Sequence, residues 1–171
     1  SNQSKAAHVH VALLSAQNML RKYLGYTPRW TVAQVLKVYP IAGSDLNAYY
    51  DRRSLKFFME PHPVTAQPVY TCLSNDVVTH EWGHSVLDSL RPDLWGSPLT
   101  EHTAFHEAFG DCMSILHLMH LDRVLNRMTE EIEAGKTSTV VSQVGEEMGN
   151  AMGFTSALRD AAQPFRYAAP A

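Results

Sequence analysis

Cysteine is scarce in this chain, and long apolar runs and an excess of positive charge are missing. Its 171 residues contain only two cysteines, Cys72 and Cys112, which are too few for a fold held together by disulfides. No run of about 18 apolar residues occurs, so the sequence predicts no membrane span. The formal net charge is −3, whereas general nucleic-acid binders are usually strongly basic. We therefore expect neither nucleic-acid nor membrane partners, and a single domain over residues 1–171.

Apolar spacing divides the chain into a mixed first part and a helical second part. The first part is predicted to form a helix at 6–24, a strand at 31–39, extended pieces at 47–50 and 55–59, and a proline-rich loop at 60–68. The second is predicted to form helices at 74–90, 101–128 and 137–152, with a loop at 92–100 and a loose or docked tail at 161–171. A small sheet region followed by helices indicates an α+β fold.

Histidine is the one residue in clear excess, with nine in the chain, and two of them belong to an H-E-x-x-H motif. This motif consists of His80, Glu81 and His84. On a helix, residues four apart lie about 40° apart around the axis, so both imidazoles can bind one metal ion. The carboxylate between them is turned away from the metal and can reach a water molecule beside it. The alternative is a pair of helical histidines that bind no metal.

A catalytic zinc ion needs a third protein ligand. The motif H-E-x-x-H-x-x-G-x-x-H cannot supply it, because Leu87 and Leu90 occupy its Gly and last His positions. Glu107 lies on the next predicted helix, with Asp111 four residues later on the same face. A ligating carboxylate and a second carboxylate that orients a histidine would fit this pair. His106 is the alternative ligand, but neighbours on a helix point about 100° apart, so only one of the two should reach the metal.

The segments DVVTHEWGH and AFHEAFGD together resemble the thermolysin-like gluzincin metallopeptidases. The resemblance implies that His80, His84 and Glu107 are zinc ligands. It further implies that Glu81 is the catalytic base and that Asp111 orients the first ligand histidine. One zinc ion, a peptide or protein substrate, and a secreted or periplasmic location follow from the same resemblance.

A third segment, Asn47-Ala48 followed by two tyrosines, resembles the edge strand with which this family pairs the substrate backbone. The resemblance thus covers residues 47–111. It implies a zincin-like fold, in which a small N-terminal sheet region precedes the H-E-x-x-H helix and a second long helix carries the third ligand. The oligomeric state does not follow from any of these patterns.

The chain departs from the family pattern at several positions. His106 stands where the family has Asn, Pro98 falls near the position of a Tyr donor, and no histidine follows His120 to match the family's later His. We expect the helical second lobe of the family to be absent or truncated. Asp76 matches an Asp that helps to bind calcium, but Leu118 stands where the family's acidic residues would complete that site, so calcium is not predicted.

Three functions are consistent with these patterns. The first is a zinc-dependent metallopeptidase that hydrolyses peptide bonds by metal-activated water, with Glu81 as general base. The second is a zinc-binding protein with little or no hydrolytic activity, because losing one transition-state donor typically costs 10²–10³ in rate. The third is a helix pair that serves as an interaction module without metal. Metal analysis separates the third from the others, and a peptide assay with a Glu81→Gln control separates the first two.

Overall fold

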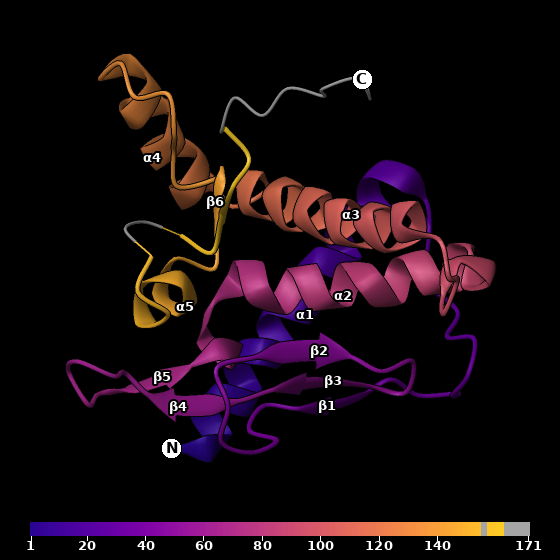
Figure 1. Ribbon diagram of the computed structural model, residues 1–171. Coiled ribbons are helices and arrows are strands. Elements are labelled where there is room, and N and C mark those ends of the chain that lie inside the picture. Colours follow the sequence, from indigo (N-terminus) through magenta and orange to yellow (C-terminus); the bar gives the residue numbers. More distant parts are fainter. Residues whose placement is uncertain (155–156, 163–171) are drawn as a thin grey trace, which may run out of the picture.

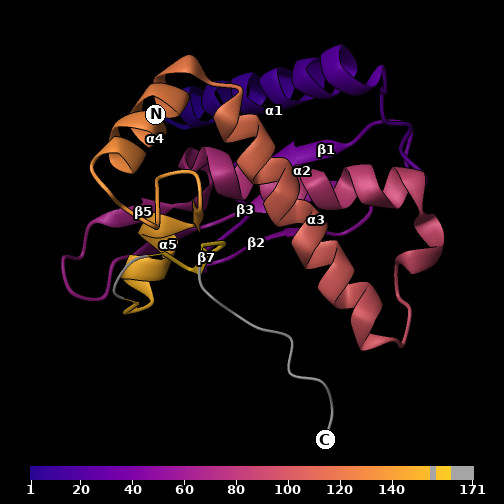
Figure 2. The same ribbon diagram turned by 90° about the horizontal axis from the view of Figure 1, so that it is seen from above.

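A small sheet and two long helices lie in successive layers in this computed structural model, which describes residues 1–154 and 157–162 (Figure 1). Helix α2 (Asn75–Leu90) lies over the sheet, and α3 (Thr100–Met119) lies over α2. Helix α1 (Asn2–Leu24) runs along one side of α2, as the view from above shows (Figure 2). The fold is therefore α+β, as the order of the predicted elements indicated.

Residues that favour helix ends lie at both ends of the first helix. The Ser1 hydroxyl accepts a hydrogen bond from the backbone N–H of Ser4, and Gly25 ends the helix with φ 63°, the left-handed region that glycine adopts most easily. Five residues at helical spacing form its buried face: Val9, Ala12, Ala16, Met19 and Leu20. The helix predicted at 6–24 is confirmed and extends to Asn2.

The main sheet has three short strands in the order β1 (Lys37–Tyr39), β3 (Ser54–Phe57) and β2 (Ala48–Tyr50). Strand β1 is parallel to β3 and β2 is antiparallel to it. The strand predicted at 31–39 forms only over its last three residues, because only these pair with β3. Strand β2 lies at the edge nearest α2 (Figure 1), and no other strand of the described residues pairs with its outer side.

A hairpin replaces the proline-rich loop predicted at 60–68. Strands β4 (Met59–Pro61) and β5 (Pro68–Tyr70) pair antiparallel, with Pro61 opposite Pro68. Prolines are tolerated at the ends of a two-stranded ladder because no inner hydrogen bond needs their missing N–H.

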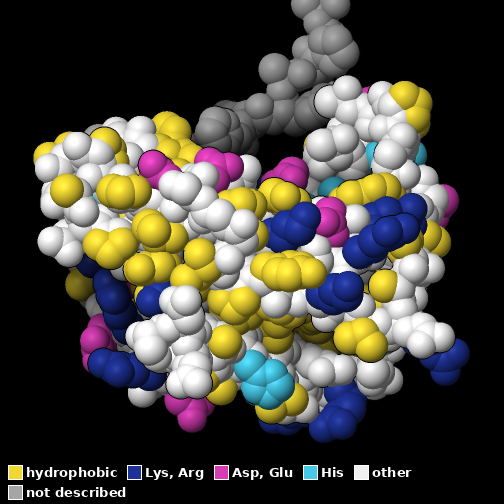
Figure 3. All heavy atoms as spheres, turned by 90° about the horizontal axis from the view of Figure 1, so that it is seen from below, with side chains coloured by type: hydrophobic (Ala, Val, Ile, Leu, Met, Phe, Trp, Pro, Cys, Tyr) yellow, Lys and Arg dark blue, Asp and Glu magenta, His cyan; other side chains and the backbone are white. Residues whose placement is uncertain are grey.

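On the face of the molecule below the sheet, hydrophobic side chains lie among Lys and Arg side chains (Figure 3).

Helix α2 is the centre of the hydrophobic core and is buried from Asp76 to Asp88. Leu55 and Phe57 of the sheet and Met113 of α3 belong to the same core cluster. The buried run also contains polar side chains, among them His80, Glu81 and Asp88, which need polar partners inside the protein. Across the ranges that the structure describes, no helix combines the length and the hydropathy needed to cross a membrane.

The long helix predicted at 101–128 is wrong as a single element. Helix α3 ends at Met119, and α4 (Asp122–Glu133) begins after Leu121, whose backbone is extended with φ −93° and ψ 110°. No Gly or Pro marks this break, and an acidic residue, Asp122, lies in the first turn of α4, where it complements the helix dipole. Apolar periodicity alone therefore could not reveal it.

The helix predicted at 137–152 is also mostly wrong. Only α5 (Glu146–Ala151) is helical, and β6 (Gln143–Val144) pairs with β7 (Arg159–Asp160). The cause is Gly145, which has φ 69° and separates the strand from the short helix. Of the tail predicted at 161–171, residues 163–171 lie outside the described residues.

His117 of α3 should make folding stability depend on pH. It is 1% exposed, and neither ring nitrogen has a hydrogen-bond partner among the described residues. Burial lowers its pKa to about 4, whereas an unfolded histidine titrates near 6.5. The unfolded chain therefore takes up this proton first as the pH falls. The free energy of unfolding should therefore decrease by roughly 3 kcal/mol as the pH falls from 6.5 to about 4.

Urea unfolding at several pH values measures this loss. The His117→Leu variant should lose less stability than the parent chain between pH 6.5 and 4.5. The matched control is His10→Leu, at an exposed position of α1, which should keep the parent's pH dependence. Equal pH dependence in the parent and in His117→Leu would show that His117 is not the group responsible.

Candidate metal centre

The two histidines and the glutamate of the H-E-x-x-H motif lie together on α2 and are buried. His80, Glu81 and His84 are exposed by 4%, 7% and 9%, and their potential ligand atoms all lie within 4.8 Å of one another. The two imidazole rings meet edge to face, with centroids 4.7 Å apart. This buried group could bind a metal ion.

Two glycines bring α3 against this face of α2. A Cβ atom at Gly83 would lie 3.0 Å from the Cα atom of Gly110, and a Cβ at Gly110 would lie 2.7 Å from Cε1 of His80. Carbon atoms pack at about 3.5–4.0 Å, so neither position has room for a side chain. The helices can cross this closely only because both residues lack one, and the crossing places Glu107 and Asp111 beside the histidines.

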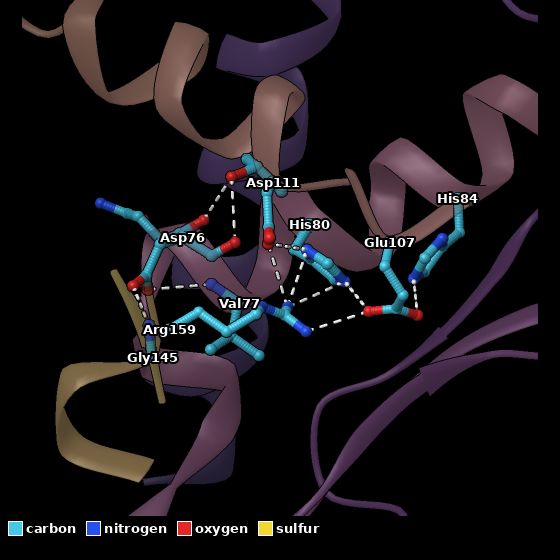
Figure 4. Close-up of polar contacts among 10 residues, drawn as sticks. Asp76, Val77, His80, His84, Glu107, Asp111, Gly145 and Arg159 are labelled. Atoms are coloured by element: carbon cyan, nitrogen blue, oxygen red, sulfur yellow. Dashed lines mark hydrogen bonds and ion pairs between the residues drawn. The ribbon is translucent and has the colours of Figure 1, made fainter. Parts of the chain in front are cut away.

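The two carboxylates of α3 each face an imidazole nitrogen (Figure 4). Glu107 lies between the two histidines, with Oε2 at 3.4 Å from Nε2 of His80 and Oε1 at 3.5 Å from Nε2 of His84. Asp111 lies on the other side of the first ring, with Oδ1 at 2.9 Å from Nδ1 of His80. The structure thus brings together the four residues to which the family resemblance assigned metal binding and orientation of the first histidine.

The charges of this cluster are set by burial and by these contacts. Burial opposes a charged imidazolium at His80, but Asp111 and Glu107 outweigh it and raise the pKa of His80 to about 9. Burial and the nearby His80 lower the pKa of His84 to about 4. The contact with His80 lowers the pKa of Glu107 to about 2. At neutral pH His84 is therefore neutral and Glu107 ionised, which are the forms that bind metals, whereas His80 carries a proton that a metal ion would have to displace.

Glu81 lies beside the cluster and points toward β2. Burial raises its pKa to about 7, against the opposing effects of His80 and of the backbone N–H of Tyr50. A carboxylate with a pKa near the working pH can both accept and release a proton. The side chain is thus suited to acid–base chemistry.

A buried charge network fixes the position of β2 relative to α2. The carboxylate of Asp88, fully buried on α2, accepts hydrogen bonds from the hydroxyls of Tyr50 and Thr31, each at 2.9 Å, and from Arg52 Nη2 at 2.8 Å. Burial and the bond to Asp88 hold the pKa of Tyr50 well above its usual value. The network holds the edge strand beside Glu81, and sequence reasoning missed it.

Asn47 and Ala48 lie in the wall of the cavity that contains the motif. This cavity has a volume of about 450 Å³, and His80, Glu81 and His84 also line it. The side-chain oxygen of Asn47 accepts a hydrogen bond from the N–H of Ala48 at 2.8 Å, and the backbone carbonyl of Asn47 accepts one from Thr71 at 2.9 Å. The cavity is large enough for a small ligand or part of a chain.

Arg159 of β7 is a site residue that sequence reasoning missed. Its Nη1 lies 3.0 Å from Oε2 of Glu107, and its Nη2 lies 3.0 Å from Oδ1 of Asp111. The same Nη2 lies 3.2 and 3.3 Å from the two ring nitrogens of His80. Figure 4 shows the guanidinium beside the ring and between both carboxylates. No periodicity surrounds this residue, so the sequence offered no signal for it.

Asp76 holds the segment that carries Arg159. One oxygen of Asp76 accepts a hydrogen bond from the backbone N–H of Gly145 at 2.6 Å, and the other accepts one from Val77 at 2.9 Å. Val144 precedes that glycine and pairs with Arg159 across β6 and β7. The residue weighed above as a calcium ligand thus anchors the last described strands to α2.

His106 was the alternative third ligand, and it lies between His84 and Trp95. Its ring is buried, with its centroid 5.6 Å from that of His84 and 5.6 Å from that of Trp95. Burial lowers its pKa. Glu107, and not His106, approaches both histidines of the motif.

Comparison with known proteins adds no assignment to this site. No protein-family model, no curated protein and no solved structure matches the chain. The interpretation of the cluster therefore depends on its geometry and on the chemistry of its residues.

Proposed function

We propose that this chain has a zincin-like fold and is a zinc-dependent metallopeptidase of gluzincin type. The observation that carries the proposal is the separation of 3.4 and 3.5 Å between the carboxylate oxygens of Glu107 and the two Nε2 atoms. Ligands about 2.1 Å from a tetrahedral zinc ion lie about 3.4 Å from one another. The same separations are long for hydrogen bonds. Each nitrogen faces a different oxygen of the one carboxylate, so an ion between the two rings could bind Glu107 through either oxygen.

Each residue of the cluster has a distinct part in this proposal. His80, His84 and Glu107 would hold the zinc ion, which supplies electrostatic activation of the substrate carbonyl and of water. Asp111 fixes the ring orientation of His80 through Nδ1, which leaves Nε2 for the metal. Glu81 accepts the proton of the attacking water and passes it to the leaving amine.

The remaining walls of the cavity suggest how a peptide would bind. The outer edge of β2 carries no strand in the described part of the chain, and an extended peptide backbone could pair there by displacing the side-chain oxygens that accept from the N–H groups of Ala48 and Tyr50. Beyond Arg159 the cavity wall is apolar and consists of Val77, Val144, Met148 and Leu158. This wall favours a substrate with an apolar side chain next to the scissile bond.

The proposal is tested on the purified chain after zinc has been supplied. Metal analysis should find one zinc ion per chain, and a mixed peptide library should be cleaved in a reaction that a chelator stops and added zinc restores. No stoichiometric zinc after supplementation would refute the metal site. Zinc without cleavage would favour the second function, a zinc-binding protein without hydrolytic activity. The observation that favours that function is the ion pairing of both α3 carboxylates with Arg159.

Replacing Asp111 by Asn should weaken zinc binding about 10–100-fold, the usual cost of losing the partner that orients a ligand histidine. The carboxylate is lost while the size is kept, and His80 loses the group 2.9 Å from its Nδ1. Competition with a chromophoric chelator measures the change. Asp93→Asn is the matched control, because Asp93 is an exposed residue that pairs with Arg91. If both variants bound zinc like the parent chain, Asp111 would have no orienting role.

A further inference from the structure

A second cavity lies apart from the candidate metal centre, between the C-terminal parts of α1 and α3. We call it the α1–α3 groove; it has a volume of about 360 Å³ and shares no lining residue with the first cavity. Apart from His120, which follows α3, its lining is apolar or aromatic: Met19, Leu20, Tyr23 and Leu24 of α1 and Met113, Leu116 and Met119 of α3. It is therefore an apolar groove that the proposed peptidase chemistry does not use.

The floor and the walls of the groove differ in exposure. Met19, Leu20 and Met113 at its floor are buried in the core, whereas Tyr23 and Leu116 in its walls are 63% and 49% exposed. Apolar walls in contact with water gain free energy when a ligand covers them. Methionine side chains are flexible and polarisable, so such a lining adapts to an alkyl chain.

A lysine ammonium lies beside the wall of the groove. Helix α1 contains no Asp or Glu, and its last turn carries Arg21 and Lys22. Nζ of Lys22 lies 5.0 Å from the ring centroid of Tyr23 in the groove wall. Helix α3 has no acidic residue after Asp111, and the next one is Asp122 at the start of α4. Lys22 therefore gives the rim of the groove a positive charge, in a chain whose net charge is −3.

We propose that the α1–α3 groove binds an alkyl carboxylate of medium chain length, with its chain between Met19, Leu116 and Met119 and its carboxylate near Lys22. The volume lies within the roughly 300–1,000 Å³ of small-molecule pockets. A protein partner usually needs about 20–30 residues on each side, far more than line this groove. The cationic rim selects an anion over a neutral or cationic ligand of the same chain length.

Binding is tested by following the methionine methyl signals in NMR spectra during titration with decanoate below its micelle concentration. Signals of Met19, Met113 and Met119 should shift. Decanoate should bind more tightly than octanoate, by roughly 4-fold for each added methylene. Decylamine, with the same chain and the opposite charge, should bind at least about 10-fold more weakly. No zinc or peptidase activity enters this measurement, so it is independent of the proposed function.

Two variants of the same kind decide whether the groove itself is the site. Leu116→Glu places a carboxylate in the wall and should abolish decanoate binding, whereas Val11→Glu, at an exposed apolar position of α1 outside the groove, should leave it unchanged. Lys22→Glu should remove the preference for decanoate over decylamine.

The proposal is overturned if the methionine signals do not move, if both amphiphiles bind equally, or if Leu116→Glu and Val11→Glu behave alike. It is also overturned if the same signals broaden with protein concentration alone, because the groove would then be covered by a second copy.

Discussion

Replacing Glu81 by Gln is expected to lower peptide hydrolysis by about 10²–10⁴-fold or more, the usual effect of losing a general base. The side chain keeps its size but can no longer accept a proton. Zinc content should stay at the parent value, because Glu81 lies beside the ligand set of His80, His84 and Glu107 and is not part of it in this proposal. Turnover of a peptide substrate and metal analysis on the same sample measure both quantities.

The control for this substitution is Glu130→Gln, at an exposed position of α4, which should change neither quantity. Equal activity in the parent chain and in Glu81→Gln would refute the mechanism whatever the metal content. Loss of zinc together with activity would instead make Glu81 a ligand. That outcome is chemically reasonable, because its carboxylate lies within 4.8 Å of potential ligand atoms of both histidines.

Replacing Gly110 by Ala should weaken zinc binding by at least about 10-fold, comparable to removing a partner that orients a ligand. The added methyl group would lie 2.7 and 2.8 Å from Cε1 and Nδ1 of His80, so either the ring or α3 must move. Either movement separates His80 from Glu107 and Asp111. Alanine favours helix formation over glycine by about 1 kcal/mol. This gain offsets part of the cost of the close contact, so the loss of thermal stability should be smaller than the loss of zinc affinity suggests.

Zinc titration by calorimetry measures the effect of this added methyl group. Ala108→Ser is the matched control, because it adds one heavy atom at an exposed position of the same helix and should leave zinc affinity unchanged. If Gly110→Ala binds zinc as tightly as the control, the close crossing of α2 and α3 does not determine the geometry of the site.

Local sequence patterns were sufficient to predict the two helices that carry the candidate site. The apolar spacing and terminal residues of 74–90 predicted α2 almost to the residue, and the i, i+4 spacing placed His80 and His84 on one face. The start of α3 was predicted equally well. Its end was not, because the break at Leu121 involves no Gly or Pro.

Helical spacing also explains why the sequence favours Glu107 over His106 as the third ligand. Glu107 and Asp111 share a face because they are four residues apart, and the two carboxylates indeed face the nitrogens of His80. What spacing could not supply was the distance between the two helices. Gly83 and Gly110 set it, and a glycine inside a helix pattern was the available sign of a close contact.

By itself, the sequence determined the α+β class, the H-E-x-x-H face of α2 and the carboxylate pair of α3, because each depends on local periodicity or on fixed spacing within one helix. Only the tertiary structure decided the positions of Arg159 and of the Asp88 network. Arg159 and Glu107 are 52 positions apart in the sequence, and Arg159 donates a hydrogen bond of 3.0 Å to the Glu107 carboxylate. Arg159 lies on a two-residue strand, which the hydrogen bond between Asp76 and Gly145 holds in place. Contacts of this kind depend on long-range packing, and no pattern in neighbouring residues encodes them.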